Sequence, residues 1–255
     1  APGPEPEGLL PPGATPGTAS GEAPRLGSFL ARAAAATAVL TVLGAVLGLV
    51  RDQAVARYFG ASDASDAFLI AWTVPEMAAT LLIEDGMALL LVPAFSLALT
   101  RRAGGTAGEA AGSDPVRDLV ATTLPRLFLL LAGGAALLIA GAPWVVGVLA
   151  PGLADPRLAV DCTRLTSVTV LTFGITGYFS AALRAHRSFL PPAGVYVAYN
   201  LGIIGMTLAL HAVWGVRAAA AGVAVGSVLM ILTQLPVFLR LVPLARPRLP
   251  RCGRP

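Results

Sequence analysis

Long apolar stretches, each close to the thickness of a bilayer, dominate the chain from residue 28 onward. An α-helix rises ~1.5 Å per residue, so about 20 apolar residues cross a hydrocarbon core of roughly 30 Å. Six stretches meet this length, at residues 28–50, 66–99, 119–142, 165–183, 189–210 and 218–239. A segment in lipid must satisfy its own backbone polar groups, which favours helices. We therefore predict an all-α polytopic integral membrane protein with about six transmembrane helices.

The ends of the chain have a different composition from its apolar middle. Residues 1–27 are rich in Pro, Gly, Ala and Glu and hold few bulky apolar residues, so we predict that they are disordered. They lack the basic region and cleavage site of a signal peptide. Residues 28–241 then form a six-helix transmembrane lobe, and residues 242–255 form a basic tail rich in Pro and Arg.

Small residues recur within the apolar segments. Gly44 and Gly48, and again Gly222 and Gly226, have the GxxxG spacing that lets two membrane helices approach closely. In a chain with 28 glycines the spacing also arises by chance, so a packing role and a coincidence both remain open.

Composition and charge exclude several classes of protein. The chain is 56% hydrophobic and only 13% charged, whereas soluble globular proteins carry about 25% charged residues. Its basic side chains, histidines aside, are all arginines, and they punctuate the apolar runs instead of gathering on one face as in a nucleic-acid-binding protein. A soluble enzyme and a nucleic-acid partner are therefore not expected.

The arginines also predict an orientation in the membrane. If the N-terminus is cytoplasmic, twelve arginines fall on the cytoplasmic side and five on the outer side. Short cytoplasmic loops carry the excess of positive charge in membrane proteins. We therefore expect both termini in the cytoplasm.

Residues that would indicate catalysis or metal binding are missing from the sequence. It has no GxSxG, P-loop or HExxH motif and no cluster of metal ligands, and its cysteines, Cys162 and Cys252, form no CxxC pair. His186 and His211 fall at predicted helix ends, where a solvated or interfacial role is expected. We predict no enzymatic activity, no cofactor and no metal.

Ionisable residues in and beside the first two apolar segments are the main candidates for function. Arg51 and Asp52 close the first segment, Asp66 opens the second, and Glu76 and Glu84 lie within it. Charged groups at membrane depth usually face a protein interior or a watery cavity. An interfacial anchor is the alternative for Arg51 and Asp52. It is also open for Glu84, about 27 Å along the helix from Asp66.

Several short motifs stand close together in this region. They are GLVRD at 48–52, ARYFGAS at 56–62, DAF at 66–68, Pro75, Glu84 and VPAF at 92–95. On these residues the chain resembles the MurJ/MviN family of lipid II flippases, within the larger superfamily of multidrug, oligosaccharidyl-lipid and polysaccharide exporters. Weaker similarity extends the resemblance over about residues 28–241, including the run that ends at Asn200.

The resemblance implies that the chain moves an undecaprenyl-pyrophosphate-linked peptidoglycan precursor across the bacterial cytoplasmic membrane by alternating access. Its partners would be this lipid, the surrounding membrane lipids, and cell-wall synthesis proteins or a second lobe. Arginine binds phosphate oxygens bidentately, so Arg51 is the first candidate for contact with the pyrophosphate. Asp52 and Asp66 would orient Arg51, and Glu84 matches a family glutamate in the substrate site.

Departures from the family pattern leave other functions open. Family arginines are replaced by Ala45, Ala79 and Thr80, and Asp85 stands where the family has a small residue. The chain also matches only the first of two lobes, as a fragment, a truncated homologue or one half of an assembly would. The alternatives are an exporter of a drug or another lipid-linked saccharide, and a non-transporting scaffold or regulator of cell-wall synthesis.

Overall fold

A computed structural model describes residues 22–104 and 114–242 of the chain. Residues 1–21 of the predicted disordered segment, and residues 243–255 of the predicted tail, lie outside this description. The described residues form helices and no strand, as predicted. The elements are α1 (Glu22–Phe59), α2 (Asp63–Ala79), the π-helical turn η1 (Thr80–Asp85), α3 (Gly86–Gly104), α4 (Pro115–Leu149), α5 (Pro156–Ala185), α6 (Leu190–Ala193), α7 (Val195–Trp214) and α8 (Arg217–Leu241).

All six predicted membrane segments correspond to helices that are long and apolar enough to cross a bilayer. One span, Asp63–Gly104, consists of α2, η1 and α3 in continuous succession, and another, Leu190–Trp214, joins α6 to α7. The fold class is therefore confirmed. The helices are longer than the apolar windows, because a helix continues through polar residues until its backbone is stopped.

Both ends of α1 show this extension. The helix begins at Glu22, inside the segment predicted to be disordered, and Pro24 is tolerated there because first-turn N–H groups have no intrahelical partner. At the other end α1 continues past Arg51 to Phe59 and stops before Gly60, whose φ of 60° suits glycine. Arg51 and Asp52 close the apolar segment but lie within the helix, which continues past them.

The turn after α1 is stabilised by a reciprocal cap. The Ser62 hydroxyl accepts a hydrogen bond from the Ser65 amide, and the Ser65 hydroxyl accepts one from the Ser62 amide. Such a capping box satisfies two amides that the first turn of α2 leaves unpaired. It fixes the start of α2 beside the end of α1.

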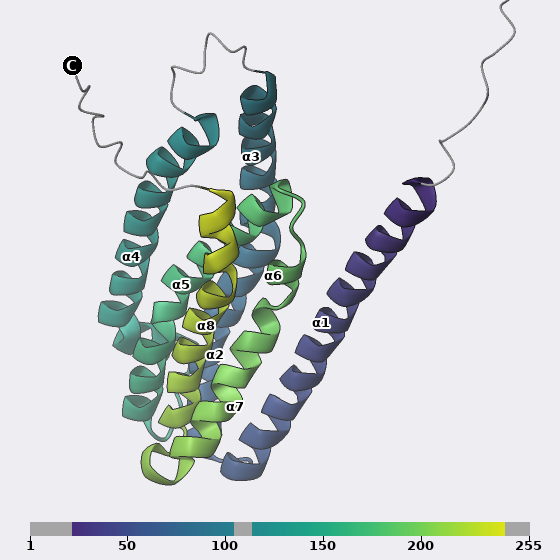
Figure 1. Ribbon diagram of the computed structural model, residues 1–255. Helices are drawn as coiled ribbons and strands as arrows, with labels where there is room; N and C mark the ends of the chain where they lie inside the picture. Colours follow the sequence, from purple (N-terminus) through teal and green to yellow (C-terminus); the bar gives the residue numbers. More distant parts are fainter. Residues whose placement is uncertain (1–21, 105–113, 243–255) are drawn as a thin grey trace, which may run out of the picture.

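Helix α5 runs through the middle of the bundle and packs on α2, α3, α4 and α8 (Figure 1). Many of its buried residues are small or carry hydroxyls that bond to their own helix, as Thr163 does to the Ala159 carbonyl at 2.8 Å. One buried pair crosses between helices, where the Gln234 amide of α8 donates to the Ser180 hydroxyl at 3.0 Å. The core is thus closely packed and its polar groups are largely satisfied within it.

Glycines bring α7 and α8 into close contact, so of the two possibilities left open for Gly222 and Gly226, packing and coincidence, the structure shows packing. A Cβ on Gly222 would lie 2.8 Å from the Ile203 Cα, and one on Gly226 would lie 2.5 Å from the Tyr199 carbonyl oxygen. Gly44 similarly lets α1 approach α7, since its Cβ would be 3.2 Å from that of Tyr196. The small-residue spacing therefore marks real helix contacts in this chain.

Helix α1 stands apart from the other helices over much of its length. Its second half packs on α7, while its first half leans away from the bundle (Figure 1). Its large apolar side chains Val39, Val42 and Leu49 are exposed, which suits contact with lipid or another protein surface.

Candidate functional site

Arg51 is held by three neighbours that fix the position of its guanidinium. Its Nε and Nη2 donate to the Asp52 Oδ1 at 3.0 and 2.9 Å, and its Nη1 donates to the Asn200 Oδ1 at 3.0 Å. The guanidinium also lies over the Trp72 ring, 4.5 Å from its centroid, as in a cation–π contact. Three helices, α1, α2 and α7, therefore meet at this one side chain.

The Trp72 ring under the guanidinium is in turn held by polar and aromatic neighbours. The Trp72 indole N–H donates to the Glu76 carboxylate at 2.7 Å, one turn along α2. Trp72 also makes edge contacts with Phe68 and Tyr199, at centroid distances of 5.2 and 6.3 Å. The ring beneath the guanidinium is thus itself positioned from two sides.

A cavity of about 610 Å³ opens on one side of Arg51, between α1 and the start of α2. This volume lies in the range of small-molecule sites. Arg51, Asp52 and Asp66 all line it, so three of the four predicted site residues come together. The other lining residues are Val55, Ala56, Gly60, Ala61, Ser65, Phe68, Leu69 and Trp72.

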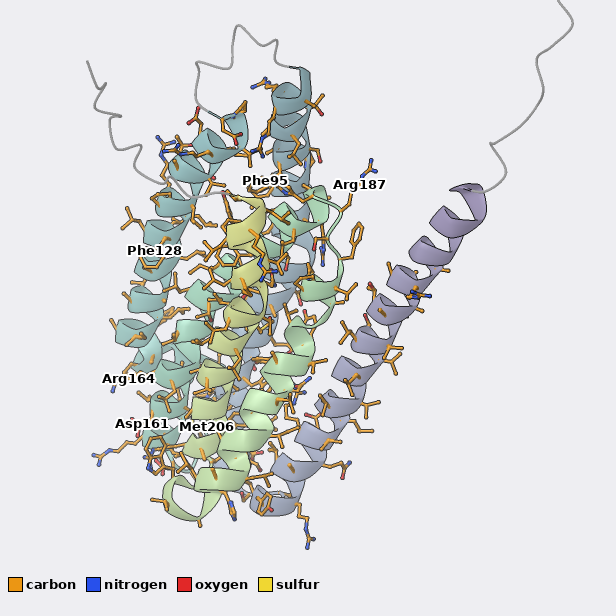
Figure 2. All side chains as sticks on the ribbon, in the orientation of Figure 1. Phe95, Phe128, Asp161, Arg164, Arg187 and Met206 are labelled. Carbon is orange, nitrogen blue, oxygen red and sulfur yellow. The ribbon has the colours of Figure 1, made fainter. Side chains whose placement is uncertain are left out.

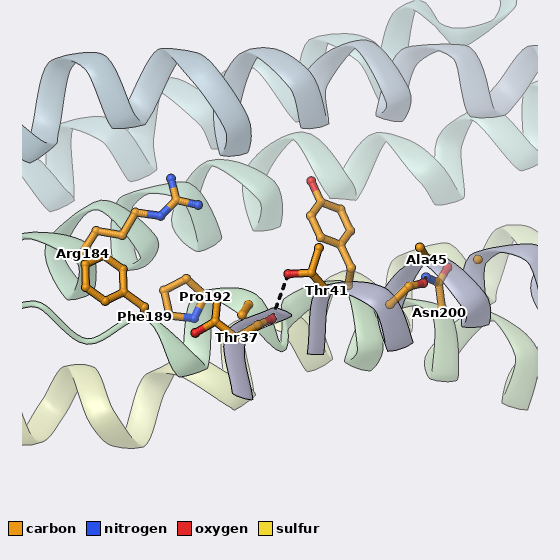
Figure 3. Close-up of a pocket in the computed structure, with 11 residues that line it drawn as sticks. Thr37, Thr41, Ala45, Arg184, Phe189, Pro192 and Asn200 are labelled. Carbon is orange, nitrogen blue, oxygen red and sulfur yellow. Dashed lines mark hydrogen bonds between the residues drawn. The ribbon is translucent and has the colours of Figure 1, made fainter. Parts of the chain in front are cut away.

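Asn200 bonds to Arg51 of this cavity and itself lines a second one. Its amide oxygen accepts from Arg51, and its amide nitrogen donates to the Gly44 carbonyl at 3.0 Å. The side chain is buried and also lines a groove of about 490 Å³ between α1, α6 and α7. Figure 3 shows the groove with Asn200 at one end and Arg184, from the last turn of α5, at the other.

Glu84, the fourth predicted site residue, lies in η1. It is 18 residues beyond Asp66 along the same span, or about 27 Å at 1.5 Å per residue. Asp66 lines the Arg51 cavity, so the backbone of Glu84 is well away from it. A role for Glu84 stays a prediction. Within residues 22–104 and 114–242, no group of His, Cys, Asp or Glu side chains could hold a metal ion.

Two residues complete the site without a role that the sequence alone predicts, Trp72 and Asn200. Trp72 follows Phe68 by one helical turn, but this spacing is common on any buried helix face. Asn200 stands in a stretch that resembles the family, and an amide within a membrane span is itself a signal, because polar groups there need a partner. Arg184 is one of the twelve arginines on the predicted cytoplasmic side, and its sequence position indicates nothing further.

Comparisons with known proteins agree on one family. A family model described as "Lipid II flippase MurJ" matches residues 55–253. A relative of that name from Burkholderia cenocepacia is 34% identical over 81% of this chain and 40% of its own length. Relatives from Treponema pallidum and Aquifex aeolicus, named probable lipid II flippase MurJ, are 23% and 26% identical over 82% and 75% of this chain. The chain spans about 40% of the length of these relatives.

Proposed function

Because the chain belongs to the lipid II flippase MurJ family, we propose that it moves an undecaprenyl-pyrophosphate-linked peptidoglycan precursor across the bacterial cytoplasmic membrane. The substrate is lipid II, and transport proceeds by alternating access. The six-helix bundle forms one wall of the path, and a second lobe completes it, since the chain spans about 40% of its curated relatives.

One observation carries the proposal: a fixed guanidinium at a cavity within membrane-spanning helices. The side chain of Arg51 is only 18% exposed. A charged side chain within membrane-spanning helices is costly, and such residues usually serve binding or transport. A pyrophosphate offers the planar pairs of oxygens that a guanidinium binds bidentately. Arg51 is therefore the substrate-binding residue, and its neighbours position it.

The hydrogen bonds of Arg51 leave room for such a ligand. Within the part of the chain that the structure describes, Asp52 and Asn200 use three of its five N–H donors. One N–H on each terminal nitrogen can still reach a phosphate oxygen. Asp52, whose side chain is 63% exposed, can also turn toward water when a more highly charged anion arrives. Asp66, in the same cavity, sets the geometry around Arg51.

The arginines at the two ends of the bundle support an orientation of the chain in the membrane. The end that holds the start of α1 and the finish of α8 also holds the finish of α3 and of α5 (Figure 1). The last turns of these two helices carry Arg101, Arg102 and Arg184. Arg187 lies at this end in Figure 2, whereas Asp161 and Arg164 lie at the other. This distribution supports a cytoplasmic position for the arginine-rich end and for both termini.

Native mass spectrometry of the purified full chain in detergent tests the proposal. The chain is mixed with lipid II and with phosphatidylglycerol, and adducts are compared for the original chain, Arg51→Gln and Arg57→Gln. Arg57 is exposed in the last turn of the same helix and is the matched control. We expect a preference for lipid II that falls about tenfold in Arg51→Gln only, since hydrogen bonds to charged groups contribute roughly 1.5–3 kcal/mol.

Equal adducts of lipid II and phosphatidylglycerol on the original chain would refute substrate recognition by this bundle. The non-transporting scaffold would then be the better explanation. A preference for lipid II that survives Arg51→Gln would keep the function and remove Arg51 from the site.

A further inference from the structure

The groove between α1, α6 and α7 has an amphipathic lining. Helix α1 contributes small and hydroxyl residues such as Thr37 and Thr41, and the facing wall contributes Phe189, Pro192 and Tyr196. Its volume of about 490 Å³ is that of a small-molecule site. Because it lies between membrane-spanning helices, a ligand with a hydrocarbon part can enter it from the lipid.

Arg184 is the charged residue among the described residues that line this groove. Three other arginines, Arg51, Arg102 and Arg217, each form an ion pair with an aspartate. No described carboxylate lies within ion-pair distance of Arg184, although its side chain is half-buried. An uncompensated guanidinium inside a groove calls for an anionic ligand.

Comparison with Arg187 shows that a positive charge at this end of α5 does not by itself place a side chain in the groove. It lies three residues after Arg184, just beyond the same helix end, where a cation also interacts favourably with the helix dipole. Arg187 is exposed and does not line the groove. The two arginines thus share their charge and their helix end and differ in access to the groove.

Helix α1 lines both the groove that holds Arg184 and the cavity that holds Arg51. Figure 3 places Arg184 toward Thr37 and Asn200 toward Ala45, and Asn200 bonds to Arg51 at 3.0 Å. Thr37 and Arg51 are 14 residues apart on α1, or about 21 Å along its axis. This separation is too long for one pyrophosphate to contact both arginines at once.

We infer that Arg184 is a second phosphate-binding arginine, which holds the pyrophosphate of a polyprenyl-linked lipid in the α1/α6/α7 groove before it reaches Arg51. The inference rests on the proposed function and adds a first binding position at the arginine-rich end. The guanidinium binds the phosphate oxygens, and the groove beside it accepts the start of the prenyl chain. The headgroup then passes along α1 toward Asn200 and Arg51.

Protection of a thiol in the groove tests this position in the full chain. The Thr41→Cys variant is labelled with a water-soluble maleimide in detergent. It also carries Cys252→Ser, which removes a second thiol that the maleimide could label. Undecaprenyl pyrophosphate is expected to slow labelling about tenfold in this chain and in its Arg187→Gln variant, but not in Arg184→Gln. Thr37→Cys, which lines the same groove, is used if the Thr41 variant does not fold.

The outcomes separate this inference from the proposed function. Protection that persists in Arg184→Gln overturns the role of Arg184, whether or not lipid II adducts depend on Arg51. Equal protection by phosphatidylglycerol and undecaprenyl pyrophosphate, both lost in Arg184→Gln, identifies an ordinary phospholipid site and overturns the assigned lipid class. If undecaprenyl pyrophosphate does not slow labelling of Thr41→Cys in the chain that keeps Arg184, the inference is overturned directly.

Discussion

The hydrogen bond between Arg51 and Asn200 is predicted to hold α1 against α7. It joins residues on two helices at 3.0 Å, and Asn200 is only 4% exposed. Hydrogen bonds to a charged group contribute roughly 1.5–3 kcal/mol to stability. Since the Arg51 side chain is 18% exposed, solvent screening is modest, and we expect a coupling of about 2 kcal/mol.

A double-mutant cycle measures this coupling directly. Arg51→Gln, Asn200→Leu and the double variant are unfolded in mixed detergent and dodecyl sulfate micelles, and the free energy of unfolding is followed by circular dichroism. Asp161 and Arg217 provide the control cycle, since this pair also joins two helices, at 2.8 Å, but its side chains are 44% and 46% exposed. Exposed ion pairs contribute about 0.2–1 kcal/mol.

Additive effects of Arg51→Gln and Asn200→Leu, within roughly 0.5 kcal/mol, would refute the reasoning. The guanidinium would then not be fixed by Asn200. Helix α7 would then not position Arg51 for an anion. A coupling as small as that of the exposed control pair would lead to the same conclusion.

Two further predictions concern the packing of the bundle. Gly202→Ala places a Cβ about 2.5 Å from the Gly226 Cα and should destabilise the chain by about 1–3 kcal/mol, whereas Gly205→Ala, with open space around it, should be neutral or stabilising in the same unfolding assay. Ser180→Ala removes the partner of the fully buried Gln234 amide and should lower the free energy of unfolding by about 1–3 kcal/mol; exposed Ser96→Ala should change it by less than about 0.5 kcal/mol.

The number and type of the elements could be predicted from the sequence because lipid restricts the choices. An apolar segment that must satisfy its own backbone becomes a helix, so each hydrophobic run gave one span. The π-helical turn over Thr80–Asp85 could not be predicted in this way. It depends on how the span fits its neighbours, since Gly177 of α5 allows the Leu82 carbonyl to approach closely.

The residues of the candidate site fall into two groups, those close together along the chain and those far apart. Arg51, Asp52 and Asp66 share a cavity because the turn after Phe59 folds the start of α2 beside the end of α1. Such short-range proximity can be read from neighbouring segments. Asn200, 149 residues from Arg51, meets it only because α7 packs on α1, and no periodicity in either segment specifies that pairing. Arg184 belongs to the groove for the same reason.

The end of α1 bears on whether Arg51 is an interfacial anchor or a cavity residue. The apolar run stops at Val50, which would put Arg51 at the membrane surface if the helix stopped there too. The helix ends instead at Phe59, because Gly60 adopts a positive φ and Ser62 caps the next helix. Arg51 is thus eight residues, or about 12 Å, inside the helix end. Its side chain is only 18% exposed, and its hydrogen bonds to Asp52 and Asn200 replace the water that an anchor would use, which favours the cavity.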